Sequence, residues 1–282
     1  MRGPGGVGGA GAVPQAAAAG GDRARRPTPL WLRSLGYYAY QYKRTWRSSL
    51  TTSFLFPVLY LAAMGIGLGT LVNHHAHRVG GVEYLDFLAP GLLAATAMQI
   101  GANESMYPVM GAIKWTRTYF AMLATPLRVA DVLLGHLGWI AVRLAMVGGI
   151  FLAVMAAFGT VASPLAPLAL LAALATGLAF AAPVSAFAAR VDNDVPFTTL
   201  YRFGLVPLFL FSGTFFPTSQ LPGWLQPVAA ATPLYHGVAL CRMLVLGQGA
   251  LWPAAVHAGY LVALAAAGYA AARRTYRRRL VV

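Results

Sequence analysis

The stretch Gly204–Gly247, GLVPLFLFSGTFFPTSQLPGWLQPVAAATPLYHGVALCRMLVLG, decides how the rest of the chain is interpreted. It is apolar enough to enter a bilayer, yet prolines and glycines interrupt it throughout. Because proline removes a backbone donor and breaks a helix interior, one uninterrupted spanning helix is excluded. The interrupting residues are Pro207, Gly213, Pro217, Pro222, Gly223, Pro227, Pro233 and Gly237.

Broken backbone at membrane depth is tolerated only where protein buries it or water lines it. We therefore predict a spanning helix that ends near Pro217, followed by a short helical hairpin over 217–247 that dips back toward the same face. The alternative is an ordinary apolar loop on the outer surface. The near-helical spacing of the apolar residues favours the hairpin. Its marker residues are Gly213, Pro217, Pro222, Trp224, Pro233 and Arg242.

Composition predicts an integral membrane protein. Hydrophobic residues make up 58% of the 282 residues and charged residues only 10%, whereas a soluble domain carries about 25% charged residues. The net charge of +14 comes from basic residues at the edges of apolar runs. They indicate membrane topology and contacts with anionic lipid, and not nucleic acid binding.

The N-terminal part predicts a tail and an interfacial helix. Residues 1–29 are rich in Gly, Ala and Pro, which predicts a disordered cytoplasmic tail. In residues 30–50 an aromatic stripe faces a basic stripe at helical spacing, which predicts a helix lying in the membrane interface. The alternative is the solvated start of the first span. The aromatic stripe is Trp31, Leu35, Tyr38, Tyr42 and Trp46, and the opposite one is Arg33, Tyr40, Arg44 and Arg47.

We predict six transmembrane helices in one all-α domain over 30–282. Their expected ranges are 52–72, 87–110, 133–158, 165–189, 197–216 and 252–272. Gly65, Gly67 and Gly69 in the first would let another helix approach closely. His74, His75 and His77 follow it, but a solvated loop is favoured over a zinc site because no carboxylate or cysteine joins them at a known ligand spacing.

The distribution of basic residues predicts the topology. Eight precede the first span, three lie between spans two and three, one follows span four and five follow span six, whereas the opposite side has only Arg78 and Arg242. By the positive-inside rule, both termini are expected in the cytoplasm and the hairpin outside.

The sequence lacks the common hydrolytic motifs. It contains only two lysines, each in the wrong context for a phosphate-binding loop, so no ATP site of that kind is expected on this chain. It also lacks HExxH and GxSxG. We therefore expect neither an enzyme nor a metal site.

Three segments resemble the membrane subunit of ABC-2 type exporters. They are the amphipathic helix over 30–50, KWTRTYFAMLATPLRVADVLLGHL at 114–137, and LFLFSGTFFPTSQLPGWLQPVAAATPLYHGVALCR at 208–242. YLDFLAPGLLAATAMQ at Tyr84–Gln99 is most similar to the subgroup that exports lipo-oligosaccharide nodulation signals, close to daunorubicin-type drug exporters. Fold does not imply function, so the subgroup does not settle the substrate.

The resemblance implies partners that composition cannot show. It implies a separate cytoplasmic ABC ATPase subunit that carries ATP and Mg, and a second permease subunit, with a homodimer as the expectation. It also implies that a short helix between spans two and three docks onto the ATPase. That helix is expected over Met122–Leu134, with Pro126 just inside its start. Its expected coupling residues are Met122, Thr125, Pro126, Leu127, Arg128, Val129, Asp131, Leu133 and Leu134.

Three charged residues lie inside the predicted spans: Glu104, Arg143 and Arg202. Each is costly in hydrocarbon, by roughly 2.5–3.5 kcal/mol, so each should face protein or water. Counted from the nearest loop at about 1.5 Å per residue, all three lie at a similar depth of roughly 12–18 Å. This predicts an ion pair of Glu104 with Arg143 or Arg202. The alternative is that both arginines reach back to the interface.

Together these features predict the multi-pass permease subunit of an ATP-driven exporter in the cell membrane. Its expected cargo is an amphipathic molecule: a lipo-oligosaccharide, a glycolipid or a hydrophobic drug. The alternatives are a non-transporting membrane scaffold or assembly factor and a passive channel.

Overall fold

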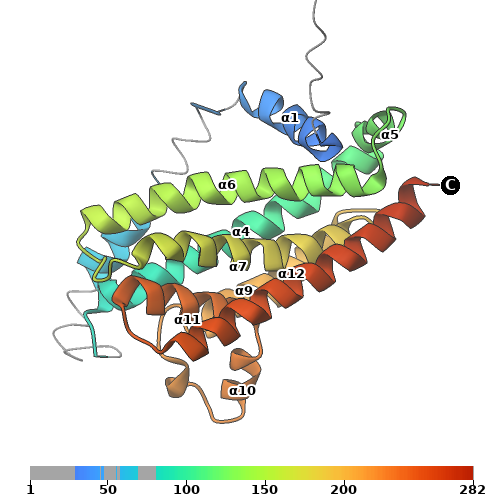
Figure 1. Ribbon diagram of the computed structural model, residues 1–282. Coiled ribbons are helices and arrows are strands. Elements are labelled where there is room, and N and C mark those ends of the chain that lie inside the picture. Colours follow the sequence, from blue (N-terminus) through green and yellow to red (C-terminus); the bar gives the residue numbers. More distant parts are fainter. Residues whose placement is uncertain (1–28, 45, 48–54, 56–57, 69–80, 282) are drawn as a thin grey trace, which may run out of the picture.

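The computed structural model describes residues 29–44, 46–47, 55, 58–68 and 81–281. These residues form helices joined by short connections, and no strand element occurs among them. Figure 1 shows the long helices running side by side, with α5 and the last turns of α12 at one end and the α10–α11 hairpin toward the other. We call these the α5 end and the hairpin end. The predicted tail over 1–29 and the loop with His74, His75 and His77 lie outside the described residues, except for Pro29.

Among the described residues, four helices are long and apolar enough to cross a membrane. They are α4 (Tyr84–Lys114), α6 (Val129–Ala157), the η2–α7 unit (Ala166–Leu168 and Ala169–Ala188) and α12 (Leu251–Leu280). At 1.5 Å per residue each exceeds or approaches the roughly 30 Å of a bilayer core. They fall on the predicted spans 87–110, 133–158, 165–189 and 252–272, which supports an integral membrane protein.

The other two predicted spans stay predictions. Over 197–216 the structure has a shorter helix in three parts: α8 (Val195–Leu200), the π-helical turn η3 (Tyr201–Leu205) and α9 (Val206–Phe211). The wider turn comes just before Pro207, which cannot donate to the preceding turn. The helix ends at Phe211, earlier than predicted, because Gly213 turns the chain with φ +83°. Of the predicted span 52–72, only Leu55 and 58–68 are described, including η1 (Ala63–Leu68).

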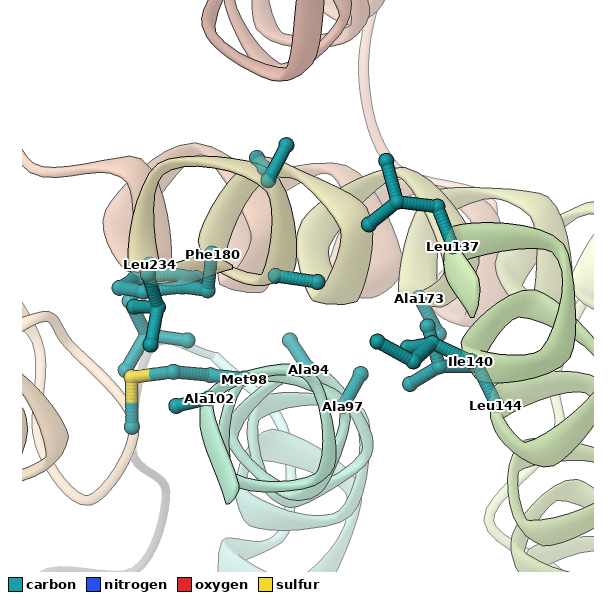
Figure 2. Packing of buried hydrophobic residues seen from close by; sticks show 14 of the residues in the cluster. Ala94, Ala97, Met98, Ala102, Leu137, Ile140, Leu144, Ala173, Phe180 and Leu234 are labelled. Carbon is teal, nitrogen blue, oxygen red and sulfur yellow. The ribbon is translucent and has the colours of Figure 1, made fainter. Parts of the chain in front are cut away.

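Helix α7 lies at the centre of the bundle and contacts α4, α6, α11 and α12. Its sequence, ALLAALATGLAFAAPVSAFA, is rich in small residues, which let neighbouring backbones approach. A Cβ added to Gly101 of α4 would collide with the backbone carbonyl of Gly177 of α7. Figure 2 shows Ala94, Ala97 and Ala102 of α4 close to α7, with Ile140 and Leu144 of α6 to one side and Leu234 of α11 to the other.

Helix α1 (Leu30–Tyr42) packs against α6 (Figure 1). The predicted aromatic stripe turns toward α6: the ring centroids of Tyr42 and Trp139 lie 5.3 Å apart, and those of Tyr38 and Trp139 lie 6.4 Å apart. The opposite stripe, with Arg33 and Tyr40, is exposed. Helix α1 ends at Tyr42, and Trp46, in a further described helical piece, is exposed; residues 45 and 48–50 of the predicted helix lie outside the described residues.

A helical hairpin follows α9, as predicted for 217–247. It contains the 3-10 turn η4 (Thr218–Gln220), the short α10 (Leu225–Ala230) and α11 (Pro233–Leu246). The hydroxyl of Thr232 accepts a hydrogen bond from the Tyr235 N–H, and Pro233 occupies the first turn, where its missing N–H costs nothing. Helix α11 packs on α4, α7 and α12, whereas α10 lies at the surface. Re-entry of this hairpin into the membrane stays a prediction.

We predict opposite effects for two glycine-to-alanine changes. Gly101→Ala should lower the free energy of unfolding by about 1–3 kcal/mol, because its methyl group forces α4 and α7 apart. Gly149→Ala, in α6 with nothing within 4 Å of its added Cβ, should raise it by about 0.5–1 kcal/mol through helix propensity. Denaturant titration of the purified protein in micelles measures both. Equal effects of the two changes would contradict the crossing.

Candidate functional site

Glu104 of α4 and Arg143 of α6 form an ion pair that joins the two helices. Oε1 of Glu104 lies 3.2 Å from Nη2 of Arg143, and the two side chains are 26% and 19% exposed. The Arg143 guanidinium also lies 5.2 Å from the ring centroid of Tyr42 of α1. The prediction of a pair between Glu104 and one of two arginines is confirmed, with Arg143 as the partner. Arg202 lies exposed on η3 and forms no ion pair with the described residues.

A buried polar network surrounds this pair, and the sequence analysis missed it. The carbonyl of Glu104 lies 3.1 Å from Nε2 of His136, and Nδ1 of His136 lies 2.6 Å from the hydroxyl of Tyr119 of α5. Because a carbonyl only accepts, a neutral imidazole must carry its proton on Nε2, so Nδ1 accepts from Tyr119. The ring of Tyr119 lies 5.6 Å from that of Tyr276 of α12. The network thus joins α5 to α4, α6 and α12.

The short helix at the α5 end lies earlier in the chain than predicted. It is α5 (Thr118–Leu123), followed by a turn and by α6, which begins at Val129. The predicted helix over Met122–Leu134 is therefore wrong. Pro126 disfavours helical backbone at Thr125, and the Asp131 carboxylate accepts from the Arg128 N–H at 2.9 Å, which caps a new helix start.

Burial divides the predicted coupling residues into two groups. Met122, Val129 and Leu133 are buried within the bundle, and Leu127 and Asp131 are partly buried. Thr125, Pro126 and Arg128 are exposed on the connecting turn. Leu134 is exposed but lies beside Trp31 and Leu137, away from the turn. Two exposed aromatic residues near this turn, Trp115 and Phe120, are 66% and 38% exposed and were not among the predicted coupling residues.

A second ion-pair cluster fastens three segments at the α5 end. Oδ1 of Asp192, in the turn between α7 and α8, accepts from Nη2 of Arg279 of α12 at 2.5 Å and lies 3.2 Å from Nζ of Lys114 of α4. Hydrogen bonds from Arg279 and then Lys114 lower the pKa of the exposed Asp192 carboxyl below its ordinary value of 3.8. The sequence analysis did not predict this cluster.

At the hairpin end, Arg242 joins the hairpin to α4. Its Nη2 donates to the carbonyls of Phe87 at 3.1 Å and Gly213 at 3.0 Å, and its Cζ lies 3.7 Å from the Phe87 ring centroid. With Pro217 and Tyr235 these residues line a cavity of about 290 Å³. Three of the predicted marker residues therefore meet here. Pro222 and Trp224 are exposed near α10, and Pro233 begins α11.

These features define the class of the protein: over the described residues it is an all-helical membrane protein in which ion pairs at Glu104 and Asp192 join separate helices. The chain belongs to the ABC-2 type transporter family, whose model matches residues 36–246. The matched part runs from α1 to the last residue of α11. Members of this family are membrane subunits of transporters, which places the chain in the cell membrane as a multi-pass protein.

The chain is similar to several proteins named Nodulation protein J. The one from Rhizobium leguminosarum bv. trifolii is 36% identical over 222 residues, which cover 78% of this chain and 80% of the relative. The one from R. leguminosarum bv. viciae is 34% identical and covers 89% and 94%. The one from R. meliloti strain 1021 is 32% identical and covers 89% and 93%. The resemblance to ABC-2 permeases is thus confirmed.

We predict a double-mutant cycle for the ion pair. Glu104→Gln removes the carboxylate that balances the charge of Arg143, so combining it with Arg143→Gln should cost less than the sum of the single changes, with a coupling of roughly 0.5–3 kcal/mol. Glu104→Gln with Arg202→Gln is the matched control and should be additive. Unfolding of the purified variants in micelles measures both cycles. Additivity in both would show that the pair contributes nothing.

We also predict a pH-dependent contribution from Asp192. Because its folded-state pKa is lowered, its stabilisation is present above the ordinary pKa of 3.8 and is lost as the pH falls through the folded-state value. Asp192→Asn should therefore lower the melting temperature at pH 7, and the difference from the unaltered protein should shrink below about pH 4. Asp194→Asn, in the same turn but in no described ion pair, should have little effect. A difference that is constant from pH 7 to pH 3 would contradict the cluster.

Proposed function

We propose that this chain is the permease subunit of an ATP-driven exporter that moves an amphipathic molecule out across the cell membrane. The observation that carries the proposal is the family match over 36–246 in a chain whose sequence has no phosphate-binding loop. Hydrolysis of ATP then takes place on a separate ABC ATPase subunit, which holds the ATP and Mg.

The proposed topology puts the α5 end in the cytoplasm. Lys114, Arg117, Arg128, Arg190 and the arginines after Ala272 gather at that end, whereas Arg242 lies at the hairpin end. The positive-inside rule favours the basic end as the cytoplasmic one. The C-terminus is then cytoplasmic and the hairpin faces outward.

The segment from Trp115 to Arg128, which contains α5, is the proposed contact with the ATPase. Its exposed aromatic residues Trp115 and Phe120 offer apolar area to a groove on the partner. Tyr119, on the buried face of the same α5, is bonded to His136, which is bonded in turn to α4. A displacement of α5 would therefore move α4 and α6 together, which is what a permease without its own nucleotide site requires.

A second permease subunit is proposed on the α8–α9 side, and we infer a homodimer. Phe203 is 80% exposed on η3, next to the exposed Arg202. Apolar neighbours suit lipid, but a charge at membrane depth must face protein or water. If a second copy of the chain closes a water-lined path on this side, Arg202 can face the water while Phe203 has apolar surroundings. Arg202 would there meet an anionic group of the cargo.

The proposed cargo is a lipo-oligosaccharide, with a glycolipid or a hydrophobic drug as the other amphipathic candidates. The similarity to proteins named Nodulation protein J supports the first. The alternative function, a non-transporting scaffold or assembly factor, predicts membrane insertion without flux. A passive channel predicts flux without ATP.

The test is ATP-dependent flux in inverted vesicles that hold the chain and its cognate ATPase. We expect a fluorescent lipo-oligosaccharide to accumulate only with ATP and both subunits. Phe120→Asp should abolish this flux while ATP hydrolysis continues, whereas Val195→Asp, exposed at the same end on α8, should leave it unchanged. Absence of ATP-dependent flux of a lipo-oligosaccharide, a glycolipid and a hydrophobic drug would favour the scaffold, and flux by the chain alone would favour the channel.

A further inference from the structure

A basic groove lies at the α5 end between the end of α7 and the last turns of α12. It has a volume of about 470 Å³ and is lined by Arg190, Arg274, Thr275, Arg278 and Arg279, together with Ala189 and Ala271. Four of these seven residues are arginines. The volume lies within the range of about 300–1,000 Å³ that is usual for small-ligand sites.

Three of the four arginines have no acidic partner among the described residues. Arg279 is bound to Asp192, but Arg190, Arg274 and Arg278 form no ion pair there. Arg274 and Arg278 are four residues apart on α12, so they lie on one face as like charges, which is unfavourable for the helix. A bound anion would relieve this repulsion.

Arg190 is held in place from the opposite wall. Its Nε donates to Oγ1 of Thr275 at 3.3 Å, and Thr275 donates in turn to the carbonyl of Ala271 at 3.0 Å. With Nε anchored, the terminal nitrogens of the guanidinium stay available as a fork of donors. Such forks bind phosphate oxygens in pairs.

The groove also lies where two apolar helices end. The apolar run of α7 stops at Ala189 and that of α12 at Ala272, and arginine follows each at once. In a membrane this is the level of the lipid headgroups, where basic pockets between helices bind anionic ones.

We propose that this groove binds the phosphate of an anionic phospholipid headgroup in the leaflet on the α5 side. A soluble phosphate offers the same chemistry, but a lipid phosphate is fixed at the depth of the groove and does not have to be recruited from solution. The site is separate from the proposed transport path, so it stands or falls without the proposed function.

The experiment titrates short-chain phosphatidylglycerol into the full-length protein in uncharged micelles and follows the melting temperature. We expect saturable stabilisation by the lipid. In Arg274→Gln/Arg278→Gln the apparent affinity should be about 30-fold weaker, because each of the two arginines contributes about 1 kcal/mol to binding of an anionic lipid. Arg190→Gln, on the other wall, should also weaken it. The matched control Arg273→Gln/Arg277→Gln removes the same charge from the same helix outside the groove and should keep the affinity.

A parallel titration with inorganic phosphate distinguishes the two sources of the anion. Saturable stabilisation by phosphate at equal concentration, lost in the same variants, would replace the lipid with a soluble phosphate. Equal losses of affinity in both double variants would show that net charge alone causes the stabilisation, which would overturn the site. Absence of stabilisation by phosphatidylglycerol would overturn it as well.

Discussion

The close approach of α4 and α7 at Gly101 and Gly177 is the constraint on which the rest of the structure depends. The same turn of α7 contacts three helices. Gly177 lies against Gly101 of α4 and Leu144 of α6, and Thr176 lies against Gly237 of α11. Glu104 lies one turn after Gly101, and Arg143 lies one residue before Leu144. The crossing therefore lies next to the ion pair, and α7 contacts both helices that carry the two charges. Without small residues here, the backbones of α4 and α7 could not approach so closely.

Polar contacts connect the parts of the bundle, some in its interior and some at its ends. Tyr119 and His136 tie α5 to the interior, Arg242 ties the hairpin to α4, and Asp192 ties α12 to α4. In a membrane such bonds replace the hydrophobic attraction that holds soluble helices together.

Several features could be predicted because they follow from local rules. Hydropathy located four long helices, and counting residues from the nearest loops placed Glu104 and Arg143 at one depth. Other features could not be predicted, because they depend on which helices meet. His136 and Tyr119 are 17 residues apart across a turn, and Asp192 and Arg279 are 87 residues apart in the sequence. The helix over Met122–Leu134, which the resemblance implied, is wrong because Pro126 lies in the turn before the cap formed by Asp131 and disfavours helical backbone at Thr125.

The most direct test of the account is site-specific cross-linking between the tip of α5 and the ATPase subunit. Cys241 is buried, so a cysteine introduced at Phe120 is the accessible thiol for a bifunctional reagent. If the ATPase binds at α5, a cross-link to the ATPase forms from position 120 in membranes that contain both subunits, and none forms from position 224 at the hairpin end. A cross-link from position 224 without one from position 120 would contradict the account.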